Sequence, residues 1–337
     1  MNGRGRGSMH WTSHIRLSCA VLIPVVIHGC WGSILKAQAW IPSKGEGTVT
    51  LTYQNYDVAG HFNAQGRKNN NGGTQSQVAV AEADYGITDT IGVTVNLPFI
   101  ASKYTGPPVY FVNDVETHPG PLDDGTYHGA FQDLRVEVRR LFWAGPIPVA
   151  PFIAASFPTH DYETVGEAVP GRHRRDLQIG ANIGVDLDRL LAGAYAHGRY
   201  GYATAQRIER FAFTRSNVDV EIGFPISSRF VLRALAGWQI RHQGPSVQEL
   251  TVDWEHHDRF IAPSYTNLGV GASVPIRGVD VYALWLGTVQ GSNGAHRART
   301  IAAGVTFAFG SRLTGLGSPP ATVPEVPRPS GDSFGRN

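Results

Sequence analysis

The stretch DLQIGANIGVDL, residues 176–187, decides the fold of this chain. Apolar side chains occupy every second position from Leu177 to Leu187, and polar residues or glycines occupy the positions between them. A period of two is typical of a β-strand with one face in an apolar environment and the other in water. The stretch is also longer than globular strands, which usually have about 5 or 6 residues. It matches the roughly 9 to 11 residues with which a tilted strand crosses a bilayer.

Similar alternating stretches recur along the chain, among them Ile91–Phe99, Leu134–Val138, Val218–Phe224 and Leu268–Ile276. They predict about twelve strands, near 46–59, 74–86, 89–102, 129–143, 146–158, 174–188, 190–202, 212–226, 228–242, 260–276, 278–290 and 296–310. An even number of strands returns both ends of the chain to the same side of a membrane. A soluble sandwich would alternate in the same way, so the strands alone leave both architectures open.

The links between these strands favour a barrel. Short links are expected at Ile87-Thr88, Gly145, Asp188-Arg189, Ser227 and Arg277, and they alternate with long links near 60–73, 103–128, 159–173, 203–211, 243–259 and 291–295. Short periplasmic turns and long extracellular loops are typical of outer-membrane barrels. Since lipid offers no hydrogen-bond partner, such a sheet has to close on itself. We therefore predict an all-β protein, a closed antiparallel up-and-down transmembrane β-barrel of about 12 strands over residues 40–310.

Both ends of the chain differ from the part between them. Residues 1–39 have a basic start, an apolar stretch broken by Pro24 and the sequence Ala37-Gln38-Ala39, which together indicate a secretory signal peptide with its cleavage site. A membrane-anchoring helix and a lipoprotein signal ending at Cys30 are the alternatives. Residues 311–337 are rich in proline and glycine, which predicts a disordered periplasmic tail.

Composition limits the partners. The chain of 337 residues is 42% hydrophobic and only 17% charged, below the roughly 25% usual for soluble domains. Of the 29 lysines and arginines, Arg4, Arg6, Arg16 and Lys36 lie in the signal segment, so the remainder is slightly outnumbered by the 27 acids. No nucleic-acid footprint remains. Both cysteines, Cys19 and Cys30, also lie in the signal segment.

One motif resembles a known family. DYGITDTIGVTVNLPFI, residues 84–100, is similar to the outer-membrane β-barrel transporter family named for the meta-pathway of phenol degradation, and GAFQDLRVEVRRLFW (129–143) resembles the strand that follows a long loop there. At Gln132 this chain departs from the glycine that is more usual in the family. The resemblance implies a small barrel associated with uptake of hydrophobic or aromatic compounds, and no agreed catalytic residue.

If the apolar faces contact lipid, a set of charged side chains points into the lumen, and we take these as candidates for solute selectivity: Asp133, Arg135, Glu137, Arg139, Asp176, Asp219, Glu221, Arg233 and Arg241. Mixed charges in a lumen could line a water path. They could equally pair with one another and hold the lumen shut. A barrel of about twelve strands lies between filled eight-stranded barrels and open channels of 16 or more strands, so both readings stay open.

The long loop 103–128 is a candidate lid, because it carries four prolines and more aromatic surface than a solvated loop needs. Its candidate aromatic residues are Tyr104, Tyr110, Phe111 and Tyr127. A mobile surface loop without such a role is the alternative.

Two other patterns point to chemistry only weakly. The densest histidine cluster, His256-His257-Asp258, has no spacing of a recognised metal motif, so we expect no metal and no cofactor. The stretch QGSNGAHR (290–297) is similar to the neighbourhood of the nucleophilic serine in outer-membrane phospholipases and lipid A deacylases, but Gln290 stands where those enzymes have the basic histidine. An esterase at Ser292 is therefore a minor alternative.

Together these features predict a non-enzymatic outer-membrane channel or transporter for small solutes, with hydrophobic or aromatic compounds as candidates. Its expected partners are outer-membrane lipid and a small-molecule solute, with no nucleic acid, and its oligomeric state is left open. A structural barrel, or one that sheathes a protein partner, is the main alternative.

Overall fold

The computed structural model describes residues 40–69, 72–107, 110–112, 115–117, 120–144, 146–227, 229–246, 257–276 and 279–310. The predictions of a signal peptide over 1–39 and of a tail over 311–337 lie outside the described residues.

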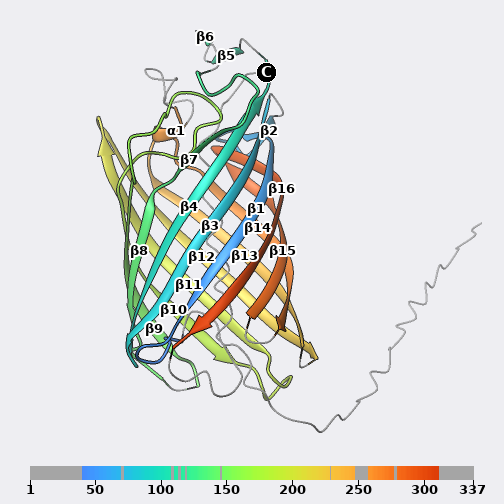
Figure 1. Cartoon of the computed structure of the whole chain (residues 1–337). Coiled ribbons are helices and arrows are strands. Elements are labelled where there is room, and N and C mark those ends of the chain that lie inside the picture. The colour runs from blue at the N-terminus through green and yellow to red at the C-terminus, as the bar shows by residue number, and fades with distance from the viewer. Residues whose placement is uncertain are drawn as a thin grey trace, which may run out of the picture. The chain divides into compact units, whose positions relative to one another are not determined.

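In this part of the chain, twelve long antiparallel strands form a closed barrel (Figure 1). They are β1 (Gly47–Phe62), β3 (Gly73–Thr88), β4 (Ile91–Thr105), β8 (Leu134–Arg140), β9 (Val149–Phe157), β10 (Asp176–Asp186), β11 (Tyr195–Ile208), β12 (Phe211–Ser227), β13 (Phe230–Gln243), β14 (Ser264–Ile276), β15 (Val279–Ser292) and β16 (Gly294–Phe309). Each pairs with its neighbour along the chain, and β16 closes on β1 from Gly47↔Phe309 to Phe62↔Gly294. The predicted architecture is confirmed.

The remaining elements are short. Strand β2 (Lys68–Asn69) pairs antiparallel with the end of β1, and β7 (His128–Phe131) pairs with the upper part of β4. Strands β5 (Tyr110–Val112) and β6 (Val115–Thr117) form a separate hairpin, and α1 (His257–Phe260) is the helix of the described chain. No helix among the described residues is long and apolar enough to span a membrane.

The two faces of the barrel differ as the alternation requires. On β1, Thr48, Thr50 and Thr52 are buried in the interior, whereas Val49, Leu51 and Tyr53 are 36%, 49% and 51% exposed on the outside. Large apolar side chains are exposed in this way on all the long strands, which suits a surface in contact with lipid. The interior is polar and closely packed around side chains such as Gln54 and Asn182, which are almost fully buried.

Four links differ in length from the sequence expectation. Residues 203–211 and 291–295 were expected to be long loops, but β11 runs to Ile208, β12 starts at Phe211, and only Asn293 separates β15 from β16. Glu209 and Asn293 adopt positive φ values of 51° and 56°, which allow such tight turns. Conversely, the turns expected at Gly145 and Asp188-Arg189 extend over 141–148 and 187–194.

The strand expected over 129–143 is interrupted at Gln132-Asp133, between β7 and β8. Pro98 on the facing strand β4 has no N–H to donate, so the ladder of hydrogen bonds is weakened at this point. The backbone N–H of Gln132 still donates to the Pro98 carbonyl at 2.9 Å. The interruption frees the side chains of Gln132 and Asp133 for contacts inside the barrel.

The segment 40–46 folds against the end of the barrel that carries the short turns. Gly45 and Gly86 are joined by a backbone hydrogen bond of 2.9 Å, and the backbone N–H of Lys44 donates to Asp89 Oδ1 at 2.9 Å. Ile41 lies close to Gly92, where a Cβ atom would stand 3.2 Å from its side chain. This segment therefore leads the chain across the rim into β1.

Candidate functional site

The interior side chains of the strands form ion pairs in the half of the barrel near the short turns. Arg139 on β8 donates to Asp84 on β3 at 2.5 Å and to Thr94 on β4 at 2.5 Å. Its side chain is 2% exposed, and that of Asp84 is 8% exposed. A buried ion pair is costly to break because the remaining charge is left without its counter-charge.

Glu137 continues this arrangement. It accepts hydrogen bonds from Arg135 at 2.9 Å and from Arg199 on β11 at 2.5 Å. Arg199 also donates to Asn182 at 3.1 Å, and its guanidinium lies 3.8 Å from the centre of the Phe152 ring. We call Asp84, Arg135, Glu137, Arg139 and Arg199 the ion-pair ladder, since these five side chains link the strands β3, β8 and β11 across the interior.

A second cluster lies at the opposite wall. Arg233 on β13 is 3.7 Å from Glu221 and 3.4 Å from Asp280, and it donates to Ser273 at 3.0 Å. The hydroxyl of Tyr195 donates to Glu221 at 2.6 Å. Paired charges therefore fill the lower interior on two sides.

Two predicted lumen residues differ from this pattern. Asp219 lies on the same face of β12 as the buried Asn217 and Glu221, but its side chain is exposed. Arg241 lies near the other end of β13, where it donates to the Gly244 carbonyl at 3.0 Å.

The remaining two, Asp133 and Asp176, lie in the upper half. Asp176 forms ion pairs with Arg215 and, at 3.8 Å, with Arg174. Asp133 accepts a hydrogen bond of 2.7 Å from the hydroxyl of Tyr162. The structure thus divides the nine predicted residues between the two halves of the interior.

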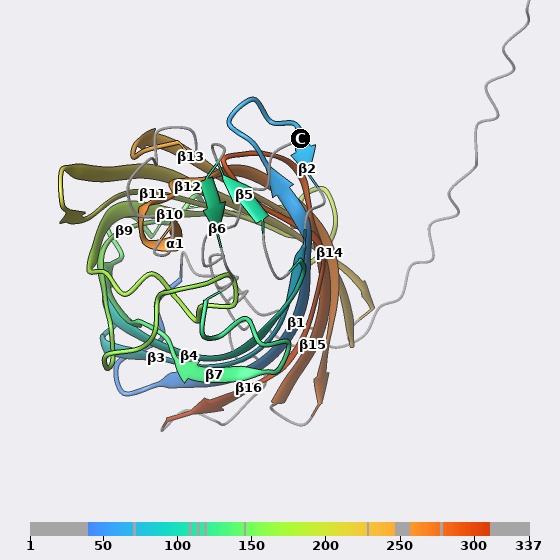
Figure 2. The ribbon, with the colours of Figure 1, turned by 90° about the horizontal axis from the view of Figure 1, so that it is seen from above.

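Sequence reasoning missed the segment that narrows the upper half. Residues 158–175, here called the plug loop, connect β9 to β10 and lie across the opening inside the ring of strands (Figure 2). Ala168 and Val169 at its tip are 1% and 0% exposed. The hydroxyl of Thr74 on the inner face of β3 donates to the Glu167 carbonyl at 3.3 Å. In the sequence, the apolar residues Ala168 and Val169 within this loop were the signal that could have indicated that it folds inward.

Asp123, from the loop between β4 and β7, holds the tip of the plug loop. Its carboxylate accepts hydrogen bonds from the backbone N–H groups of Glu167 and Ala168, each at 2.8 Å at the nearer oxygen, and of Gly120 at 2.9 Å. Gly166 adopts φ +120°, and a Cβ there would stand 2.7 Å from Asp123 Oδ2, so only glycine suits this approach. We call these contacts the Asp123 latch.

The pKa values of Asp123 and of its sequence neighbour Asp124 are shifted in opposite directions. Burial raises the pKa of the Asp123 carboxyl, and the backbone hydrogen bond from Glu167 opposes this rise. Hydrogen bonds from Thr126 and His128 lower the pKa of the exposed Asp124 to about 2. The two acids are adjacent in sequence, but only Asp123 contacts the plug loop.

Gln132 is a second anchor. Its side-chain amide donates to the Pro170 carbonyl in the plug loop, and its own carbonyl accepts from the Thr159 hydroxyl at 3.2 Å. Gln132 is 8% exposed. The residue at which this chain departs from the family resemblance therefore ties the plug loop to the barrel wall.

A second segment, 257–263, also folds into this end of the barrel. Phe260, Ile261 and Ala262 form a buried apolar cluster with Phe213 on the inner face of β12. The Gln239 amide donates to the Pro263 carbonyl at 2.8 Å, and Arg174 donates to the Arg259 carbonyl at 3.1 Å. Arg174 therefore links this segment to the plug loop.

The candidate lid aromatics do not form one group among the described side chains. Tyr104 is 4% exposed on the inner face of β4, whereas Tyr127 is 42% exposed with Lys103 Nζ 5.0 Å from its ring centre. The side chains of Tyr110 and Phe111 lie outside the described residues.

The weaker chemical candidates show no assembled site. Within the described residues, no group of three or more His, Cys, Asp or Glu side chains could hold a metal ion, and His256 lies outside them. Ser292 pairs with Ser264 on β14, and the His296 ring lies edge-on to Phe62, with centroids 5.3 Å apart. In the described part of the chain, His296 Nδ1 is buried without a hydrogen-bond partner, so this nitrogen does not bond to Ser292 as the base of a hydrolase would.

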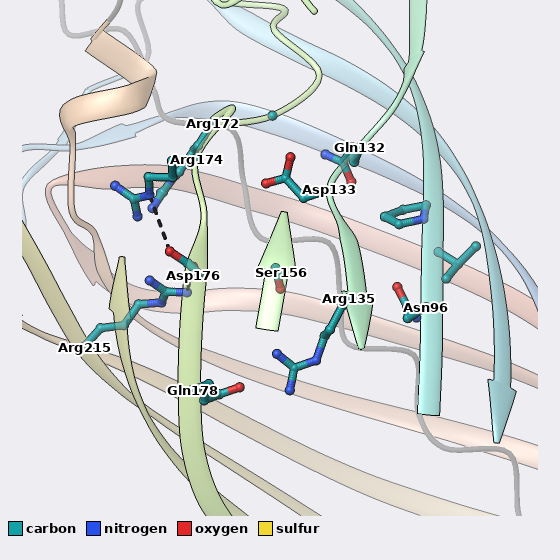
Figure 3. Close-up of a pocket in the computed structure, with 13 residues that line it drawn as sticks. Asn96, Gln132, Asp133, Arg135, Ser156, Arg172, Arg174, Asp176, Gln178 and Arg215 are labelled. Atoms are coloured by element: carbon teal, nitrogen blue, oxygen red, sulfur yellow. Dashed lines mark hydrogen bonds and ion pairs between the residues drawn. The ribbon is translucent and has the colours of Figure 1, made fainter. Parts of the chain in front are cut away.

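Below the plug loop, the upper interior holds a cavity of about 130 Å³ (Figure 3). Its walls come from β3, β4, β8, β9, β10, β12 and the plug loop. The lining residues are Val80, Asn96, Pro98, Gln132, Asp133, Arg135, Ser156, Gly171, Arg172, Arg174, Asp176, Gln178 and Arg215.

Comparisons agree with the architecture. No protein-family model matches the sequence, and no curated protein matches it. Among solved structures, the COG4313 outer membrane channel from Pseudomonas putida F1 aligns with a TM-score of 0.62 at 11% identity, covering 82% of this chain and 100% of that one.

Two further structures align less well. The translocator domain of the autotransporter NalP from Neisseria meningitidis has a TM-score of 0.45 at 14% identity, over 79% of this chain and 89% of that one. A deletion mutant of TodX, a monoaromatic hydrocarbon channel, has a TM-score of 0.41 at 7% identity, over 83% and 93%. The closed twelve-strand barrel, its apolar outer face and the first of these alignments define the class: the chain has the fold of a bacterial outer-membrane β-barrel.

Proposed function

We propose that the chain is an outer-membrane channel that admits small solutes, with hydrophobic or aromatic compounds as the candidate class. The observation that carries this proposal is the cavity below the plug loop, which lies inside the barrel between the loop-covered end and the ion-pair ladder. A solute that enters from the loop side reaches polar and charged side chains there. The fold similarity to a protein described as an outer membrane channel supports the same function.

The charged lumen residues are proposed to set selectivity in two ways. Asp133, bonded to the Tyr162 hydroxyl, and Asp176, paired with Arg215 and Arg174, lie where a solute would first enter the interior. The ion-pair ladder lies further along the path and narrows it. Tyr104, at the inner rim, and Tyr127, at the exposed mouth, are the described aromatic side chains past which a solute would enter.

Conductance in planar bilayers tests the proposal. The purified full chain should give stepwise currents, and an Arg135→Gln variant should change their ion selectivity because Arg135 lines the cavity and contacts Glu137. Arg140→Gln is the matched control, since Arg140 lies nearby on β8 with its side chain exposed on the outside of the barrel. Absence of any current and of any solute flux into liposomes, with folded protein in the bilayer, would refute the channel.

A structural or partner-sheathing barrel is the second candidate, and the ion-pair ladder favours it. Paired charges that are almost fully buried could hold the lumen permanently shut. This alternative expects no flux and a stable protein complex after mild extraction from membranes. Flux without such a complex would exclude it.

A further inference from the structure

The cavity below the plug loop carries an imbalance of charge. Among the described residues that line it, four are arginines and two are aspartates. Figure 3 shows Arg172, Arg174 and Arg215 gathered around Asp176 on one side. Arg135 projects from β8 into the lower part of the cavity, where it also contacts Glu137. Guanidinium groups gathered in a narrow site attract anions.

Two of the arginines, Arg174 and Arg215, are held in place by contacts with neighbouring residues. Arg174 is 3% exposed, its guanidinium lies 4.4 Å from the centre of the Phe213 ring, and it donates to the Arg259 carbonyl at 3.1 Å. Arg215 is 7% exposed and forms an ion pair with Asp176. A group of fixed guanidinium groups loses little conformational entropy when it binds an anion.

The opposite wall of the cavity carries an apolar patch beside the amide side chains of Asn96 and Gln132. Val80 on β3 and Pro98 on β4 are paired across the two strands and both line the cavity. In the strand order, β3 lies on the opposite side of the ring from β12, which carries Arg215. Val80 belongs to a buried apolar cluster that includes Val78 and Ile100 on the same inner wall. The cavity therefore offers guanidinium groups at one end and an apolar surface at the other.

We propose that this cavity binds a small aromatic monocarboxylate, with its carboxylate toward Arg215 and Arg174 and its ring toward Val80 and Pro98, an inference that rests on the proposed channel function. Arginine matches the geometry of a carboxylate through paired N–H donors. The cavity measures about 130 Å³, the same order as the roughly 150 Å³ cavity that holds a benzene ring, so a single-ring ligand is the upper size limit. Gly171 and Arg172 of the plug loop form part of its wall, so the loop lies beside the bound ligand.

Binding to the purified full chain in detergent, measured by isothermal titration calorimetry, tests the proposal. The probes are benzoate, benzyl alcohol, acetate and inorganic phosphate. We expect benzoate to bind at least tenfold more tightly than the others, since only benzoate has both the anionic group and the ring. Equal affinity for benzyl alcohol would refute the arginine site, and equal affinity for acetate or phosphate would refute the apolar wall.

Two substitutions with opposite expected effects locate the binding. Arg215→Gln removes one guanidinium and should weaken benzoate binding about tenfold. Asp176→Asn removes a negative charge beside the same arginines and should tighten it several-fold. Arg299→Gln is the control, because Arg299 is 51% exposed and pairs with Asp57 elsewhere on the barrel. Heat-modifiable gel mobility checks that each variant is folded.

The results separate this proposal from the channel function. Conductance without preferential benzoate binding would overturn the aromatic carboxylate site and leave the channel in place. Benzoate binding that follows the two substitutions, without flux through the wild-type chain, would support the site and overturn the channel. If both substitutions weaken binding equally, the opposite charge effects are absent and the site is wrong.

Discussion

The two halves of the barrel interior are closed by different means. Near the short turns, side chains of the strands themselves fill the lumen, and Arg139, Glu137 and Arg199 connect neighbouring and distant strands. Near the long links, the plug loop and the segment 257–263 fold inward and are held by a few hydrogen bonds. Strand side chains move little without disturbing the sheet, whereas loops can open locally. The comparison indicates that the constriction formed by strand side chains near the short turns is fixed, whereas the one formed by the plug loop and segment 257–263 is movable.

This difference separates the two readings of the charged lumen. Asp84, Arg139 and Glu137 behave as a structural ladder, since each is almost fully buried with a partner of opposite charge. Asp133, Asp176 and Arg215 line a cavity that a solute could occupy. Charges of the same chemical type thus serve stability in one half and, by our proposal, solute binding in the other.

The largest effect is expected from the ladder. Arg139→Met should lower the free energy of unfolding by about 3–5 kcal/mol, because Asp84 is left buried without its partner. Unfolding in urea, followed by gel mobility, measures the change. Arg140→Met is the control, since Arg140 is exposed on the outer face of the same strand. A loss below about 1 kcal/mol, the size of a surface pair, would show that the ladder is not a structural element.

The next effect is expected from the Asp123 latch. Asp123→Ala leaves three backbone N–H groups without their acceptor, each at a cost of about 1–3 kcal/mol if they stay buried. The plug loop should therefore open more often, and single-channel conductance should rise several-fold at nearly unchanged barrel stability. Asp124→Ala should change neither quantity, since Asp124 bonds within its own turn to Thr126 and His128. Unchanged conductance in Asp123→Ala would argue against a movable constriction.

Deletion of residues 106–124 extends this test to the whole loop. The barrel should still assemble, because surface loops contribute little to its hydrogen bonding, and conductance should match that of Asp123→Ala because the latch is removed. A changed preference between aromatic and aliphatic solutes, beyond that of Asp123→Ala, would support the candidate lid. If the deleted chain failed to show heat-modifiable mobility, the claim that the strands alone carry the stability of the barrel would be contradicted.

A smaller effect is expected at Gln132. Gln132→Gly restores the residue more usual in the resembling family and removes the amide that donates to Pro170. The loss of one such bond is worth about 0.5–1.5 kcal/mol, so proteolysis within the plug loop should become a few-fold faster. Gln75→Gly is the control, since Gln75 lies on the outer face of β3 with its side chain exposed. If the plug loop were cleaved at the same rate in Gln132→Gly and wild type, Gln132 would not be an anchor of the plug loop.

The smallest effect is expected from pH. The closed latch raises the pKa of Asp123 by burial, so the closed form binds a proton more tightly than an open loop with an ordinary carboxyl. Conductance should therefore fall modestly as the pH is lowered through the raised pKa of Asp123 toward the ordinary carboxyl pKa. In Asp123→Ala this dependence should disappear. A dependence that remains in the variant would assign it to another group, of which Glu167 beside the latch is the first to test.

The local sequence determined the barrel. Alternation in 176–187 and its repeats requires one apolar and one wet face, and the backbone must be fully paired in lipid, so a closed ring of long strands was the consistent solution. The positions of Glu137, Arg139 and Glu221 on the inner face follow from the same period of two.

Only the tertiary structure decided how the lumen is closed. Arg139 meets Asp84, 55 positions earlier in the chain, and Asp123 meets Glu167, 44 positions later. No period or spacing relates such residues, because their contacts depend on barrel closure and on the path of two loops through its mouth. Gln132 illustrates the same limit: its departure from the family pattern was visible in the sequence, but its bond to Pro170 exists only once the plug loop folds inward.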